Sequence, residues 1–140
     1  MTNLYIDFDG VIVNTIDITY EIANKQGIEK SEEGYSEFYQ SLDWTGVLEQ
    51  CVPIHDSWNC IQKIIDSEKF NVSILTHVNS LHEAEQKVRY IRKYFEDITI
   101  IPVPKVISKT QMIKTEGSIL VDDFVENLVE WEAKGGYVLI

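Results

Sequence analysis

The sequence contains few cysteines and no long apolar run. Cys51 and Cys60 are the only cysteines among 140 residues, and they do not have the Cys-x-x-Cys spacing of a metal site. We therefore expect free thiols in a reducing compartment rather than a disulfide framework. No segment approaches the ~20 apolar residues that cross a bilayer, and the first residues lack the basic and apolar parts of a secretory signal. These absences predict a soluble, cytoplasmic protein without a membrane partner.

Basic residues are also scarce. The chain has 12 lysines and arginines against 23 aspartates and glutamates, which gives a formal net charge of -11. Proteins that bind nucleic acid polymers draw much of their affinity from many basic side chains that neutralise phosphates, so we expect no such partner. A small anionic ligand held by one metal ion and one lysine remains compatible with this charge. The 44% apolar content and the length are typical of one globular domain spanning residues 1–140.

Five short apolar runs, each bounded by turn residues, predict strands. They cover residues 4–8, 72–75, 98–103, 118–121 and 137–140. A Ser-x-x-Glu capping pattern at Ser80 and Glu83 opens a helix with apolar residues at helical spacing, and a second helical pattern from Phe124 ends at Lys134 and Gly135. Alternating strands and helices predict a Rossmann-like, three-layer α/β/α fold with a parallel sheet of about five strands.

The segment between the first two predicted strands has a different pattern. It contains helical periodicity at residues 16–26, 35–42 and 55–70 but no strand. We interpret about 15–52 as a small helical cap inserted after the first strand. Because no flexible linker or low-complexity tract surrounds it, the cap is expected to belong to the single domain.

Two aspartates stand at the end of the first strand, where an apolar run normally carries no charge. Asp7 and Asp9 precede Gly10, which lets the backbone turn away from the strand. One interpretation is that both aspartates are turn formers. Unpaired carboxylates beside a core strand are costly, however, so a divalent metal ion or a proton is expected to compensate them. In open α/β sheets, ligands bind outside the carboxyl ends of the strands, which is where this pair lies.

Further polar residues follow the later strands. Thr76 comes after the second, Lys105 and Lys109 after the third, and Asp122 and Asp123 after the fourth. Together with the Asp-x-Asp-Gly-Val run, these residues resemble in order the four motifs of the haloacid dehalogenase (HAD) superfamily of phosphotransferases. The resemblance covers almost the whole chain, and the Asp-x-Asp-Gly-Val and Val-Asp-Asp elements are specific in combination.

The resemblance implies a Mg²⁺-dependent phosphomonoester hydrolase. Asp7 would attack phosphorus and form an aspartyl-phosphate, and Asp9 would protonate the leaving oxygen and then activate water. This division of labour implies an ionised Asp7 on Mg²⁺ and an Asp9 held protonated by burial and hydrogen bonding. Asp122 and Asp123 would complete the Mg²⁺ shell, to which Asp9 can add its backbone carbonyl. Thr76 would hydrogen-bond a phosphate oxygen.

One lysine would also bind the phosphate, and three lysines near the fourth strand are candidates. We prefer Lys109, because it begins a short helix-like stretch at Ser108 ahead of the fourth strand, an arrangement similar to compact nucleotidase-like members. Lys105 is the alternative, since it lies nearer the end of the third strand. Lys114 is the third candidate. Outside such a motif, each would be read as an ordinary solvated surface residue.

The short cap, the Thr76 motif and residues 119–136 resemble the 5'-nucleotidase type C branch, which includes deoxyribonucleotidases. This implies a (deoxy)ribonucleoside monophosphate as substrate, while a phosphatase of another small phosphomonoester, such as a sugar phosphate, and a non-catalytic binding module with the same fold are the alternatives. Aromatic rings in the cap could stack on a base or form the core of the cap. These cap aromatics are Tyr20, Tyr35, Phe38, Tyr39 and Trp44. We take Tyr39, Trp44 and His77 as candidate substrate contacts beside Thr76 and Lys109.

Overall fold

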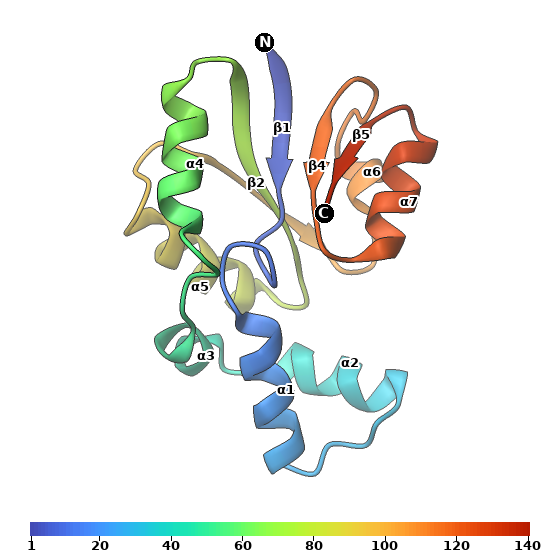
Figure 1. The fold of residues 1–140 in the computed structure, drawn as a ribbon. Helices are drawn as coiled ribbons and strands as arrows, with labels where there is room; N and C mark the ends of the chain where they lie inside the picture. Colours follow the sequence, from blue (N-terminus) through green and yellow to red (C-terminus); the bar gives the residue numbers. More distant parts are fainter.

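Five parallel strands form one sheet in the order β3-β2-β1-β4-β5. The computed structural model describes residues 1–140 (Figure 1). The strands are β1 (Thr2–Ile6), β2 (Phe70–Val78), β3 (Thr99–Pro104), β4 (Ile119–Val121) and β5 (Tyr137–Leu139). The central strand β1 is the first in sequence, so the chain builds one half of the sheet and then crosses to the other. The predicted α/β class and the five-stranded parallel sheet are confirmed.

Seven helices accompany the sheet. They are α1 (Thr15–Lys25), α2 (Glu32–Ser41), α3 (Trp44–Gln50), α4 (Ser57–Asp66), α5 (Leu81–Arg92), α6 (Lys109–Met112) and α7 (Val125–Ala133). Neighbouring residues of a strand face opposite sides of the sheet, and consecutive residues of β2 therefore join different core clusters. Ile74 belongs to the same core cluster as Ile61 of α4 and Ile91 of α5, whereas Leu75 belongs to the cluster that contains Trp131 of α7. Helices therefore cover both faces in the predicted three layers.

Helix α5 begins as predicted but buries a different face. Ser80 is its N-cap and accepts a hydrogen bond from the backbone N–H of Glu83 at 3.0 Å. The Glu83 side chain does not return to Ser80; it accepts from Asn79 instead. Leu81, expected on the apolar face, is 90% exposed, and Glu83 and Lys87 are buried with the apolar residues of the later turns. The first turns of α5 face polar groups, so the apolar pattern alone assigned the wrong residues to the buried side.

Helices α1, α2 and α3 gather beyond the carboxyl ends of the strands (Figure 1). The segment enters and leaves the sheet at one place, because the Asn14 N–H donates to the Val52 carbonyl at 3.1 Å and the Asn14 side chain accepts from the Val52 N–H at 2.7 Å. Sequence periodicity predicted α1 and α2 but not the seven-residue α3, which packs against α1 and α5. Helix α4 ends at Asp66, several residues before the predicted boundary.

None of the seven helices has the length and apolar character needed to cross a membrane. Cys51 is buried and Cys60 is exposed, and both are free thiols.

Candidate active site

The end of β1 lies where the order of the sheet reverses. Strand β1 pairs with β2 on one side and with β4 on the other, and its last residue, Ile6, is in register with Ile74 and Val121. The next residue, Asp7, donates its backbone N–H to the Val121 carbonyl at 2.9 Å. The residue after Val121 is Asp122, so the register itself brings these two aspartates together. Such switch points are the usual ligand sites of open α/β sheets.

Three carboxylates form a compact group at this point. Asp7, Asp122 and Asp123 each offer an oxygen within 4.8 Å of the others. Asp7 and Asp122 are buried, and Asp123 is exposed. Carboxylate oxygens without nitrogen or sulfur ligands suit a hard cation such as Mg²⁺, which also keeps several waters. The donor set therefore fits the expected metal ion.

Gly10 makes room for the third carboxylate. Its φ of +77° lies in the left-handed region, and a Cβ atom at this position would overlap the carboxylate of Asp123. The Asp-x-Asp-Gly run thus ends in glycine for two reasons, a positive φ and a close approach.

Lys109 is the cation of the acidic group. Its Nζ lies 3.0 Å from Asp7 Oδ1 and 2.9 Å from Asp122 Oδ2, and the side chain is 2% exposed. Ser108 caps helix α6 and so fixes the place where Lys109 begins it. Lys105 is exposed, with its Nζ 5.6 Å from the centre of the Phe124 ring, and Lys114 is exposed as well. Of the three candidate lysines, the structure brings Lys109 to Asp7.

The acidic group shifts the pKa values of its members. Burial, the Asp122 charge and the Asp9 charge raise the pKa of Asp7 to about 8, although Lys109 acts in the opposite direction. Burial also acts to raise the pKa of Asp122, but Lys109 and the donated hydrogen bonds outweigh it and lower that pKa. For Lys109, burial lowers the pKa, and the Asp7 and Asp122 charges more than offset this effect and raise it. A divalent cation beside Asp7 would act as Lys109 does and favour the ionised carboxylate.

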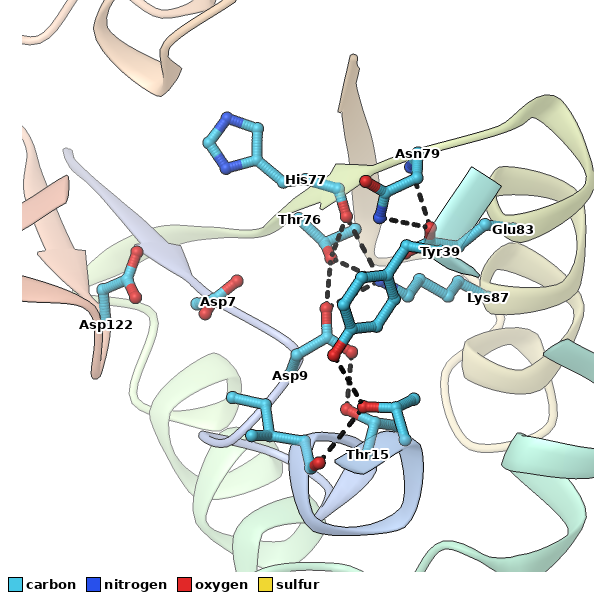
Figure 2. Close-up of polar contacts among 12 residues, drawn as sticks. Asp7, Asp9, Thr15, Tyr39, Thr76, His77, Asn79, Glu83, Lys87 and Asp122 are labelled. Carbon is cyan, nitrogen blue, oxygen red and sulfur yellow. Dashed lines mark hydrogen bonds and ion pairs between the residues drawn. The ribbon is translucent and has the colours of Figure 1, made fainter. Parts of the chain in front are cut away.

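Asp9 faces the same cavity but has different partners. Its Oδ2 accepts from Lys87 Nζ at 2.7 Å and from Thr76 Oγ1 at 3.5 Å, and its Oδ1 accepts from Thr15 Oγ1 at 2.5 Å (Figure 2). These contacts come from α5, β2 and the start of α1, so three parts of the chain hold the Asp9 carboxylate.

Thr76 and His77 lie at the end of β2. The Thr76 hydroxyl is buried beside Asp9, and it accepts from Lys87 Nζ at 3.2 Å. The His77 ring points away from Asp9 and Thr76, and its Nε2 lies 2.9 Å from the Ile107 carbonyl (Figure 2). Burial and the nearby lysines lower the pKa of His77, which favours its neutral form. His77 lines the same cavity as Asp7 and Asp9.

Two solved structures share this architecture. One is a hydrolase from Pseudomonas syringae, with a TM-score of 0.64 and 11% sequence identity over 99% of this chain and 82% of that chain. The other is a HAD phosphatase from Thermococcus onnurineus, with a TM-score of 0.56 and 10% identity over 99% of this chain and 85% of that chain. No protein-family model matches the sequence, and no curated protein does. The chain therefore shares the fold of these two structures.

The sheet and the helices between β1 and β2 line a cavity of about 330 Å³. Asp7, Asp9 and Asp123 lie on its sheet side, and four aromatic residues line it. These are Tyr20, Tyr39, Trp44 and Phe124. Of the cap aromatics proposed from the sequence, Tyr35 and Phe38 do not line the cavity; they pack against Tyr20 and Tyr39, respectively. Phe124, which lies outside the cap, was not expected here.

Sequence reasoning missed several polar residues of the site, most importantly Lys87. A weak signal was present, because Lys87 lies on the predicted apolar side of its helix, three residues after Ala84 and four before Ile91. A charge inside an apolar helical stripe indicates a buried partner. Its partner Glu83 precedes it by one turn but was interpreted as a helix cap. Thr15, which binds Asp9, carried no such signal.

Proposed function

We propose that the protein is a Mg²⁺-dependent phosphomonoester hydrolase of the HAD type. The observation that carries the proposal is the contact of the buried Lys109 ammonium with Asp7 and Asp122, beside the exposed Asp123. A phosphoryl transfer site needs a nucleophile, a fixed cation for the phosphate oxygens and ligands for a metal ion, and this group offers all three. The two similar structures, a hydrolase and a HAD phosphatase, agree with this proposal.

Asp7 is the proposed nucleophile. One of its carboxylate oxygens attacks phosphorus, the bond from phosphorus to the leaving oxygen breaks, and an aspartyl-phosphate forms. A water molecule then attacks this phosphorus, which releases phosphate and regenerates the Asp7 carboxylate. Lys109 would donate to the phosphate oxygens throughout. Mg²⁺ held by Asp7, Asp122 and Asp123 would neutralise charge on the phosphoryl group.

Asp9 is the proposed acid and base. It faces the cavity two residues from Asp7 and would give a proton to the leaving oxygen and take one from the attacking water. Thr76 would hydrogen-bond a phosphate oxygen with the hydroxyl that lies beside Asp9.

The proposed substrate is a (deoxy)ribonucleoside monophosphate, cleaved as by a 5'(3')-nucleotidase. Support comes from the aromatic lining of the cavity, since Tyr39 and Trp44 of the cap and Phe124 between β4 and α7 offer rings to a base. Hydroxyl and amide groups also line the cavity, among them Thr19, Asn79 and Asn127. These polar groups favour a second candidate substrate, a sugar phosphate.

A panel of phosphomonoesters tests both the proposed phosphatase activity and the proposed substrate class. Phosphate release would be measured with nucleoside and deoxyribonucleoside monophosphates, sugar phosphates and p-nitrophenyl phosphate, each with Mg²⁺ and with EDTA. We expect Mg²⁺-dependent turnover that is highest for deoxyribonucleoside monophosphates and absent in the Asp7→Asn variant. Equal turnover of sugar phosphates would remove the nucleotidase assignment. No turnover of any ester would leave the binding-module alternative and refute the phosphatase.

A further inference from the structure

The site contains a second buried lysine that the four HAD motifs do not assign. Lys87 of α5 is 1% exposed. Its Nζ lies 2.5 Å from Glu83 Oε2 and 2.7 Å from Asp9 Oδ2, and it also donates to Thr76 Oγ1 and to the His77 carbonyl, both at 3.2 Å. Figure 2 shows these groups converging on one ammonium from three parts of the chain.

Glu83 has hydrogen-bond donors other than Lys87. Glu83 Oε1 accepts from the backbone N–H of Asn79 at 2.8 Å and from its side-chain amide at 3.0 Å, so Lys87 is not the only group that compensates Glu83. A buried ion pair serving only the stability of α5 would need no contact with the site. Here the ammonium bridges Glu83 to Asp9, so a rigid helix is joined to a carboxylate on the loop after β1.

Two aromatic rings keep water from the ammonium. The Trp44 ring centre lies 4.7 Å from Lys87 Nζ, and the Phe8 ring centre lies 5.6 Å from it. Trp44 belongs to α3, and its backbone N–H donates to His82 Nε2 of α5 at 3.1 Å. The Lys87 ion pairs are therefore enclosed between the cap and α5, where electrostatic contacts are stronger than in water.

We propose that Lys87 is a positioning residue that fixes the orientation of Asp9 for proton transfer. Lys87 and Thr76 hold Oδ2 of Asp9 from the side of β2 and α5, and Thr15 holds Oδ1 from the side of α1. An acid–base group must lie within hydrogen-bond reach of the reacting oxygen, and small displacements are costly. Lys87 acts through Asp9 and does not itself bind the substrate. This inference rests on the proposed phosphatase function.

The test compares two ion pairs of the same helix. The variant Glu83→Gln/Lys87→Met replaces the buried pair by neutral side chains of similar length, a change that proteins often tolerate. Its control is Glu85→Gln/Arg89→Met, which removes an exposed pair two residues further along the same helix, with 3.7 Å between Arg89 and Glu85. Thermal unfolding of both variants, and calorimetric binding of inorganic phosphate with Mg²⁺, report on folding and on the intact phosphate site independently of turnover.

Kinetics with two kinds of leaving group give the decisive result. We expect the buried-pair variant to lose roughly 10²-fold in kcat on an alkyl phosphate, with KM within about two-fold, because proton transfer is impaired while phosphate binding is not. The loss should be smaller on p-nitrophenyl phosphate, whose leaving group needs no proton. In an Asp9→Asn background, Lys87→Met should cause no further loss, because both changes act on the same group.

Each alternative result overturns the inference. Unchanged kcat in the buried-pair variant, an equal loss on both esters, or additive losses of Lys87→Met and Asp9→Asn would show that Lys87 has only a structural role. These outcomes leave the proposed phosphatase intact. A wild-type protein that hydrolyses no phosphomonoester would instead refute the proposed function and this inference together.

Discussion

The Lys109 ammonium lies 3.0 Å from Oδ1 of Asp7, although 102 positions of sequence separate the two residues. The contact is buried, and the same ammonium lies 2.9 Å from Asp122. One cation therefore compensates two carboxylates that would otherwise be costly to bury. It also lies where a phosphate bound at Asp7 would need a positive charge.

Replacing Asp7 tests the covalent mechanism. Asp7→Asn substitutes an amide of the same shape for the attacking carboxylate, so Mg²⁺-dependent phosphate release should fall to the background rate while the circular dichroism spectrum stays that of the wild type. The variant should also fail to form an acid-stable phosphoenzyme with labelled substrate. Retained turnover would contradict the assignment of Asp7 as nucleophile.

Replacing Lys109 and Lys105 one at a time separates their roles. Lys109→Met should reduce kcat by about 10²- to 10³-fold, the loss typical of removing one group that stabilises transition-state charge. It should also destabilise the metal-free protein by about 3–5 kcal/mol, because Asp7 and Asp122 lose their buried partner. Lys105→Ala should affect KM more than kcat, since Lys105 lines the cavity but lies outside the acidic group. A larger loss of kcat in Lys105→Ala than in Lys109→Met would instead make Lys105 the phosphate-binding lysine.

The pKa of Asp7 determines how the metal-free protein responds to pH. That pKa is about 8 in the fold against an ordinary 3.8, so between these values the folded state binds more protons than the unfolded state, and stability falls as pH rises. Asp7→Asn lacks this effect. In EDTA, the variant should gain stability relative to the wild type as pH rises from ~5 to ~8, by at least ~1.4 kcal/mol near neutrality, the equivalent of one pKa unit.

Thermal unfolding at several pH values measures this difference. Mg²⁺ should reverse this difference in stability, because it binds the ionised carboxylate of the wild type in preference to the amide of the variant. A stability difference between the wild type and Asp7→Asn that does not vary with pH in EDTA would show that the fold does not raise the pKa of Asp7.

Gly10 is predicted to be required for the metal site. Gly10→Ala should cost about 1–3 kcal/mol from its positive φ, and its Cβ should displace Asp123 and weaken Mg²⁺ binding. Gly46→Ala in α3 is the matched control, because a Cβ there meets no atom within 4 Å. The control should be neutral or stabilising by about 0.4–1 kcal/mol. Equal Mg²⁺ affinity in both variants, measured by calorimetry, would argue against a metal role for Asp123.

The fold was predictable because its signals are local. Apolar runs with turn residues at their ends predicted the five strands, and capping and periodicity predicted the helices at Ser80 and Phe124. Helix α3 was missed because its seven residues are too few for periodicity to emerge, and packing against α1 and α5 stabilises it. Leu81 was misplaced because a helical pattern does not show whether the facing surface is apolar or polar.

The sequence by itself determined that Asp7, Asp9, Thr76 and the Asp122 and Asp123 pair meet at one edge of the sheet, since parallel strands end on the same side. Only the tertiary structure decided which side chains pair there. It placed Lys109 rather than Lys105 on Asp7, directed Lys87 to Asp9, and separated the cap aromatics that face the cavity from those that pack together. The physical reason is that burial and charge pairing depend on residues distant in the chain, whose meeting no local pattern records.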